Sequence, residues 1–175
     1  MHTDDTAGGR LAAGHLLERG HRRFGFLGEA QISDRYVSPS QRRLEGYRVA
    51  LADAGHPLRD EDVRLVRHRA REALSAAHEL LSRPEHPTAV FAADDTLAAG
   101  VLRAARDVGL TVPRDVAVVG FDDGELAEVI DLTTIRQPLE ESGRAAAERL
   151  IQQLDHRTTA RDLALELELI VRGTT

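Results

Sequence analysis

The sequence predicts an α/β fold, a doubly wound parallel sheet with helices on both faces, and three observations lead to this prediction. Short apolar runs typical of buried strands alternate along the chain with stretches of helical periodicity. Glycine or proline separates most of these segments, as expected where helices and strands end. Successive parallel strands need right-handed crossovers, so the connecting helices cover both faces of the sheet. The 175 residues, 42% of them hydrophobic, suffice for one globular domain.

The N-terminal part is expected to start with a helix and to continue into a buried strand. Residues 8–19 place their apolar side chains around one side of a helix. Gly20 follows at the position where a residue in the left-handed conformation commonly ends a helix. The short apolar run over residues 23–28 then predicts the strand.

The second helix has the clearest start signal in the chain. Ser38, Pro39 and Gln41 supply a capping hydroxyl, a first-turn proline and a returning amide. Apolar residues recur on one helical face from there until Gly55, and the proline at position 57 prevents further helix.

Strands and helices continue to alternate up to the C-terminus. The expected strands cover residues 63–66, 89–93, 116–120 and 133–137, and the expected helices cover residues 71–82, 96–108, 124–130 and 140–154. A last strand over residues 163–171 alternates Leu with Glu, which predicts an edge strand with one face in water.

The composition removes several functional classes. The net charge of -6 leaves no excess of positive charge for phosphates, so specific binding of duplex DNA by this chain alone is not expected. All 23 basic residues are arginine, so Walker A sites, Schiff-base chemistry and pyridoxal-phosphate anchoring lack their lysine. The eight histidines show no close ligand spacing on one helical face, and there is no cysteine. We therefore expect neither a cofactor nor a metal site.

The expected location is the cytoplasm. The absence of cysteine fits a reducing compartment. Residues 1–10 are polar and acidic rather than a basic stretch followed by an apolar one, and no apolar run approaches the length of a membrane span. Export and membrane insertion are both disfavoured.

Four acidic residues stand directly after expected strands. Asp94 and Asp95 follow the strand over 89–93, and Asp122 and Asp123 follow the strand over 116–120. In doubly wound sheets, ligands bind at the carboxyl ends of the strands. If these acids converge with Arg43, which lies on the helix after the first strand, the site offers several acceptors and one bidentate donor. Such a set suits a ligand rich in hydroxyl groups.

The same residues have other interpretations. Asp95 and Asp123 stand where helix caps are common, while Asp94 and Asp122 could be solvated loop acids and Arg43 a surface helix residue. A second functional interpretation takes the four acids as a magnesium site for phosphoryl transfer or hydrolysis. The phosphoacceptor variant of that site normally needs a lysine, and the sequence has none.

Six ordered blocks of sequence give the chain a resemblance to a known family. The blocks read GGRLA at 8–12, GHRR at 20–23, RLEGY at 43–47, PTAVFAADD at 87–95, VPRDVAVVGFDD at 112–123 and LTTIRQP at 132–138. In this order they resemble the LacI/GalR family of bacterial transcription repressors, over nearly the whole chain. The resemblance implies a type I lobe like that of a periplasmic binding protein, with Arg43, Asp94 and Asp122 contacting the effector. Asp94 stands where the family usually has an asparagine, and a carboxylate can only accept hydrogen bonds.

The resemblance also implies that the chain carries only part of such a repressor. Residues 1–131 are expected to form the C-terminal lobe, residues 132–158 a returning segment of an incomplete first lobe, and residues 159–175 a final strand back in the C-terminal lobe. The helix-turn-helix and most of the first lobe are expected to lie upstream of Met1 in the natural gene.

The sequence therefore predicts the effector-sensing part of a LacI-type transcriptional regulator, not an enzyme. The expected partners are a small sugar-like or nucleoside-like effector and a second copy of the chain in a homodimer. Operator DNA would be bound only through the missing helix-turn-helix. A stand-alone sugar-binding module is the first alternative, and a magnesium-dependent phosphoryl-transfer enzyme is the second.

Overall fold

A six-stranded sheet forms the centre of the computed structural model, which describes residues 2–31, 35–154 and 164–175. The strand order is β3-β2-β4-β5-β6-β8. The strands are β2 (Phe24–Glu29), β3 (Val63–Val66), β4 (Ala89–Ala92), β5 (Ala117–Asp122), β6 (Thr133–Arg136) and β8 (Glu168–Ile170). The first five are parallel, and the direction of winding reverses between β2 and β4. Ligands of doubly wound sheets bind at such a reversal, outside the carboxyl ends of the strands.

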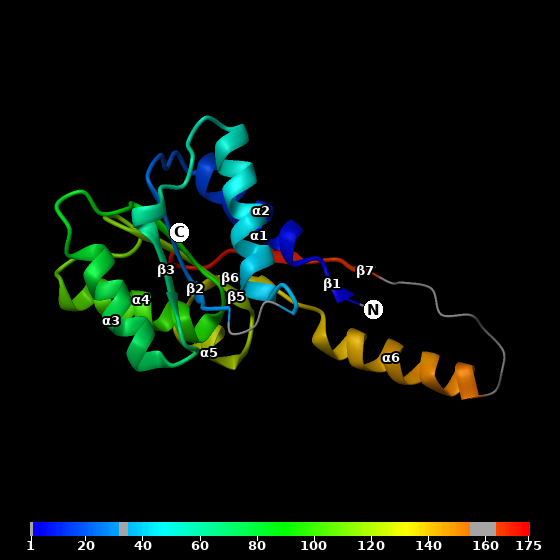
Figure 1. The fold of residues 1–175 in the computed structure, drawn as a ribbon. Coiled ribbons are helices and arrows are strands. Elements are labelled where there is room, and N and C mark those ends of the chain that lie inside the picture. The colour runs from blue at the N-terminus through cyan, green and yellow to red at the C-terminus, as the bar shows by residue number, and fades with distance from the viewer. Residues whose placement is uncertain (1, 32–34, 155–163) are drawn as a thin grey trace.

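Helices cover both faces of the sheet, which confirms the predicted fold class. The pair α1 (Asp5–Glu18) and α2 (Pro39–Asp53) packs together on one face, and the pair α3 (Ala70–Leu81) and α4 (Asp95–Asp107) packs on the other (Figure 1). The short helix α5 (Glu125–Val129) adjoins α4, and a single 3-10 turn, η1 (Asp60–Asp62), precedes β3.

The core lies between the sheet and the two helix pairs, and aromatic side chains fill the α2 side. Phe26 of β2, Phe91 of β4 and Tyr47 of α2 are fully buried. The ring centroids of Phe26 and Phe91 are 5.6 Å apart, and those of Tyr47 and Phe91 are 5.3 Å apart. These separations lie in the range that aromatic pairs prefer, so the three rings join two strands to the covering helix.

The helix ends follow the predicted signals, with one exception at the N-terminus. Ser38 caps α2 by accepting a hydrogen bond from the backbone N of Gln41, and Gly20 has a φ of +85° after α1. Both were expected. Helix α1 begins at Asp5 rather than at residue 8, because the side chain of Asp4 caps it by accepting from the backbone N of Ala7.

The last expected strand proved to be two. Within residues 163–171, β7 (Ala164–Leu165) pairs with β1 (His2–Thr3), whereas β8 pairs with β6. Residue 163 lies outside the described residues. As expected, β8 occupies a sheet edge, but it runs antiparallel to β6, so the sheet is mixed rather than purely parallel. An antiparallel edge strand on a parallel sheet is common in such folds.

The strand β6 lies in this sheet and not in a separate lobe. Its residues pair with β5 on one side and β8 on the other, and Thr133 to Ile135 are buried. The expectation that this strand belongs to a returning segment of another lobe is wrong, because its apolar face completes the present core. The helix α6 (Leu139–Leu154), in contrast, projects away from the body (Figure 1).

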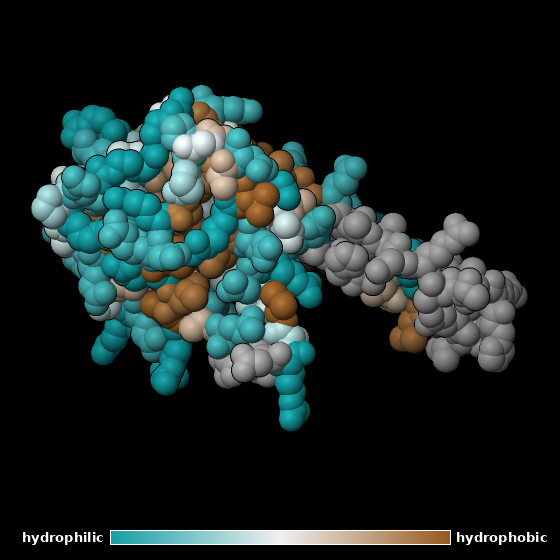
Figure 2. All heavy atoms as spheres, turned by 45° about the horizontal axis from the view of Figure 1, so that its top comes forward, coloured by the Kyte–Doolittle hydropathy of each residue, from teal (hydrophilic) through white to brown (hydrophobic). Residues whose placement is uncertain are grey.

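Apolar side chains of α6 are left exposed by this arrangement. Leu139, Leu150 and Ile151 are each about three-fifths exposed to solvent. Figure 2 shows a largely hydrophilic face on the body, with smaller apolar patches there and on the projecting helix. No helix in the described part of the chain is long and apolar enough to cross a membrane.

Candidate ligand-binding site

Arg43, Asp94 and Asp122 come together at the carboxyl ends of the central strands. Asp94 follows β4, Asp122 is the last residue of β5, and Arg43 reaches this edge from α2. Nη1 of Arg43 donates to the carbonyl oxygen of Ala93, the residue before Asp94, and its Cζ lies over the ring of Phe121, the residue before Asp122. The predicted convergence is therefore present, next to the reversal between β2 and β4.

The guanidinium of Arg43 is held rigidly from three directions. Its Nε donates to Oδ1 of Asp5 over 2.8 Å, and its Nη1 donates to the carbonyl oxygen of Ala93 over 2.5 Å. Its Cζ lies 3.5 Å from the centroid of the Phe121 ring. Arg43 and Asp5 are both buried, so the interpretation of Arg43 as a surface residue is wrong. The remaining nitrogen, Nη2, donates no hydrogen bond to any of the described residues.

Asp94 caps α4, a role that the sequence assigned to Asp95. Oδ1 of Asp94 accepts from the backbone N of Leu97 over 2.8 Å, and Oδ2 lies 3.1 Å from Nε2 of His68. The cap arises because Asp94 has extended backbone angles directly before the first helical turn. The asparagine that the family resemblance leads one to expect here is thus replaced by a carboxylate whose second oxygen faces a histidine.

Asp122 occupies an unusual backbone conformation at the end of β5. Its φ is 111°, and its carboxylate accepts a hydrogen bond from Nε2 of Gln137. Burial raises the pKa of Asp122, and the hydrogen bond from Gln137 and the positive charge of Arg43 offset only part of that effect. The carboxylate is therefore partly desolvated and placed beside a fixed cation.

Asp123 does not cap the helix that follows it. Gly124 holds the cap position of α5, and the Asp123 carboxylate instead forms ion pairs of 2.7 Å with Arg136 and with Arg172. Burial works against the charged carboxylate, but the hydrogen bonds from Arg172 and Arg136 together hold the pKa of Asp123 below its usual value. Asp123 thus fastens the turn after β5 to β6 and to the C-terminal segment.

Three residues of the site were not singled out from the sequence. Asp5 positions Arg43, His68 lies against Asp94, and Gln137 donates to Asp122. His68 and Gln137 each stand one or two residues beyond a strand, so the rule that selected the acids could have found them. Asp5 carries no such signal, because its contact with Arg43 depends on how α1 packs against α2.

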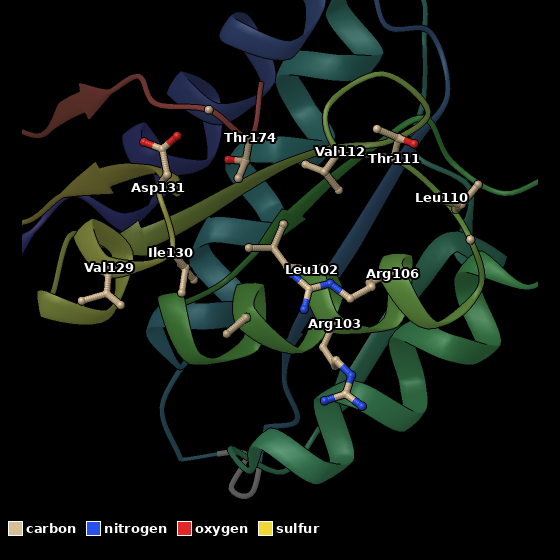
Figure 3. Close-up of a pocket in the computed structure, with 13 residues that line it drawn as sticks. Leu102, Arg103, Arg106, Leu110, Thr111, Val112, Val129, Ile130, Asp131 and Thr174 are labelled. Atoms are coloured by element: carbon tan, nitrogen blue, oxygen red, sulfur yellow. The ribbon is translucent and has the colours of Figure 1, made fainter.

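The described residues hold no group of three or more His, Asp or Glu side chains arranged to bind a metal ion. A groove of about 820 Å³ lies elsewhere, between α4, the loop after it and the end of α5. Figure 3 shows Leu102, Arg103 and Arg106 of α4 on one side of this groove and Val129 and Ile130 on the other. None of the three predicted site residues lines it.

Comparison with known proteins identifies the family of the chain. The sequence model of the periplasmic binding protein-like domain matches residues 13–175. The chain belongs to this family. An HTH-type transcriptional regulator from the aml 5' region of Streptomyces limosus is 40% identical over 98% of this chain and 49% of its own length. The ribose operon repressor of Escherichia coli K12 is 36% identical over 95% of this chain and 50% of its own length.

Solved structures of LacI-type regulators share the fold. The complex of the transcriptional regulator CelR with cellobiose has a TM-score of 0.88 and 37% identity, over 99% of this chain and 53% of that one. A regulatory protein of the LacI family from Chloroflexus aggregans has a TM-score of 0.90 and 32% identity, over 98% of this chain and 62% of that one. The resemblance to LacI-type repressors is confirmed, and the chain spans about half the length of the curated relatives it matches.

Proposed function

We propose that this chain is the effector-sensing lobe of a LacI-type transcriptional regulator and that it binds a small sugar through Arg43, Asp94 and Asp122. The observation that carries the proposal is the fixed guanidinium of Arg43, held by Asp5 and Phe121 at the sheet's point of reversal. Its orientation is set before any ligand arrives, so a ligand would gain a directed donor at little entropic cost.

The chemistry of the site favours a neutral ligand rich in hydroxyl groups. Asp5 already balances the charge of Arg43, and the carboxylates of Asp94 and Asp122 add negative charge beside it. Anionic ligands would be repelled by these two carboxylates, whereas sugar hydroxyls can donate to them and accept from Arg43. The relative CelR was solved with cellobiose, which supports a sugar as the ligand class.

The other half of the ligand cleft would come from a second lobe. In this proposal α6 belongs to that lobe, because its exposed Leu139, Leu150 and Ile151 need a partner surface. The body formed by β2–β6 and β8 is then the C-terminal lobe. We place the regulator in the cytoplasm, where it would bind operator DNA through a helix-turn-helix and perform no catalysis.

A ligand screen tests the proposed function. Melting temperatures of the longest natural polypeptide that contains these residues would be measured with cellobiose, ribose, other sugars and nucleosides. A ligand at one hundred times its Kd stabilises the native state by about 2.7 kcal/mol. Asp122→Ala is expected to remove the response, whereas Asp107→Ala, which changes an exposed carboxylate on α4, should retain it. A wild-type protein that responds to none of these ligands would contradict the proposal.

We further propose that the groove beside α4 and α5 is the surface through which two copies associate. The groove is mainly apolar, and Val129 at its rim is 82% exposed. Arg106 and Asp131 both line the groove, so a two-fold axis through it would bring side chains of opposite charge from the two copies together.

The oligomeric state tests this surface. Val129→Glu is expected to shift the protein from dimer to monomer in sedimentation velocity at about micromolar concentration, because it buries a charge in an apolar contact. Val171→Glu changes another half-exposed valine outside the groove and should leave the dimer intact. A monomeric wild type, or a dimer that Val129→Glu leaves unchanged, would contradict the proposal that the groove is the dimer interface.

A further inference from the structure

The turn after β5 holds two consecutive residues in a conformation that side chains disfavour. Asp122 has a φ of 111° and Asp123 a φ of 56°, and neither is a glycine. Such backbone angles persist only where the surrounding structure imposes them, and they cluster at ligand sites. The groups that impose this turn therefore decide where the Asp122 carboxylate lies.

Asp95 holds the turn at Gly124. Its Oδ2 accepts a hydrogen bond from the backbone N of Gly124 over 2.9 Å, and its Oδ1 accepts one from Oγ1 of Thr134 over 2.7 Å. Asp95 is only 5% exposed, although it is the first residue of α4. One carboxylate thus joins the start of α4, the turn after β5 and the middle of β6.

The space around Asp95 is shaped for this carboxylate. A side chain at position 120 would bring its Cβ to 2.6 Å from Oδ1 of Asp95 and to 2.7 Å from Cδ2 of Leu132. Gly120 is therefore the residue in β5 that lets the carboxylate approach the strand. Both oxygens of Asp95 accept hydrogen bonds from groups of the protein itself.

We infer that Asp95 is a positioning residue of the ligand site, which fixes the turn over residues 122–124 and so presents the Asp122 carboxylate to the effector. Asp95 acts through Gly124 and Thr134 and does not contact the ligand. The inference concerns the turn itself, and its consequence for binding rests on the proposed function.

The charge state of Asp95 makes the hold on the turn depend on pH. The charged groups that act on the pKa of Asp95 are the carboxylates of Asp122 and Asp123, and Asp123 is itself paired with Arg136 and Arg172. Burial raises the pKa of Asp95 to about 6, and the hydrogen bonds from Thr134 and Gly124 lower it by less. The ionised form accepts from both donors, so protonation below this pH weakens the hold on Gly124.

Folding stability has the opposite dependence on pH. Because the pKa of Asp95 in the folded protein lies above its value in the unfolded chain, the fold favours the protonated form. The contribution of Asp95 to stability is therefore fully present below about pH 4 and is lost as the pH rises through about 6. A residue with only a structural role would not combine this loss of stability with a gain in ligand affinity.

The experiment compares wild type with Asp95→Asn, Asp95→Ala, Thr134→Val and the matched Thr134→Ser. Without ligand, the amide signals of Asp122, Asp123 and Gly124 are followed by NMR from pH 4.5 to 8, a range of ~3.5 units around the pKa. The Gly124 signal should show a transition at about pH 6 in the wild type, and this transition should be absent in Asp95→Asn, where only the neighbouring Asp122 still titrates. Asp95→Ala and Thr134→Val should shift the signals of the turn, and Thr134→Ser should preserve them.

With cellobiose as the probe, calorimetric affinity is the second measurement. Asp95→Ala should weaken binding at pH 7.5 by about tenfold, the effect of losing roughly one charge-assisted hydrogen bond. Wild-type affinity should fall between pH 7 and 5, and that of Asp95→Asn should change less. Should Asp95→Ala not fold, Asp95→Asn and Thr134→Val carry the test.

Two results would overturn the inference. The first is that the amide signals of the turn are the same in wild type, Asp95→Asn and Thr134→Val. The other is a shifted turn with unchanged cellobiose affinity, which would leave Asp95 without influence on the site. The proposed function fails if the wild type does not bind cellobiose and if Asp122→Ala does not remove the response to any other sugar. The NMR comparison needs no ligand, so it still decides whether Asp95 sets the turn.

Discussion

Arg43→Ala is expected to abolish sugar binding and to lower the free energy of unfolding by about 3–5 kcal/mol. The ligand loses its directed donor, and the carboxylate of Asp5 is left buried without a counter-charge. The carbonyl of Ala93 and the ring of Phe121 lose their contacts as well. Chemical denaturation and calorimetric titration with the sugar found in the screen would measure the two effects separately.

A second variant separates stability from binding. In the double variant Asp5→Ala/Arg43→Ala, both members of the buried pair are removed, so part of the lost stability should return while binding stays absent. Arg48→Ala changes an arginine on the same helix whose exposed pair with Asp60 contributes little, about 0.5 kcal/mol. Equal sugar affinity in Arg43→Ala and Arg48→Ala would remove Arg43 from the site.

The part of the site that could be predicted is the part that the strand order determines. In parallel strands, the residues that follow each strand reach the same edge, so the sequence alone suffices to place Asp94 and Asp122 together. It does not suffice to assign their individual roles. Which of the adjacent Asp94 and Asp95 caps α4 depends on a backbone angle at one residue, and that angle places Asp94 outside the helix and turns Asp95 into the core.

The contacts of Asp5 and Asp123 show why the rest of the site escaped prediction. Asp5 reaches Arg43 across 38 positions of sequence, and Asp123 pairs with Arg172 in the segment after β8. Neither pairing leaves a local pattern. Similarly, the alternation of Leu and Glu over residues 163–171 predicts an edge strand, but it does not show that β7 and β8 pair with different strands.

The close packing of α1 on α2 is the feature that brings Asp5 to Arg43, and glycine makes it possible. A Cβ at position 9 of α1 would lie 2.0 Å from the carbonyl oxygen of Arg43 and 2.7 Å from the backbone N of Tyr47. Both obstacles are backbone atoms of α2, so no side-chain movement relieves the clash. The two helices would have to separate at the residue that fixes the guanidinium.

Gly9→Ala is therefore expected to destabilise the protein by about 3 kcal/mol, at the upper end of the usual cost of overpacking, and to weaken sugar binding. Gly14→Ala provides the matched control on the same helix, because a Cβ there meets nothing within 4 Å. Without a clash, alanine's higher helix propensity should stabilise the protein by up to ~1 kcal/mol. Urea denaturation should therefore show a lower free energy of unfolding than wild type for Gly9→Ala and a higher one for Gly14→Ala. Equal changes in both would show that helix propensity, and not the contact between α1 and α2, governs position 9.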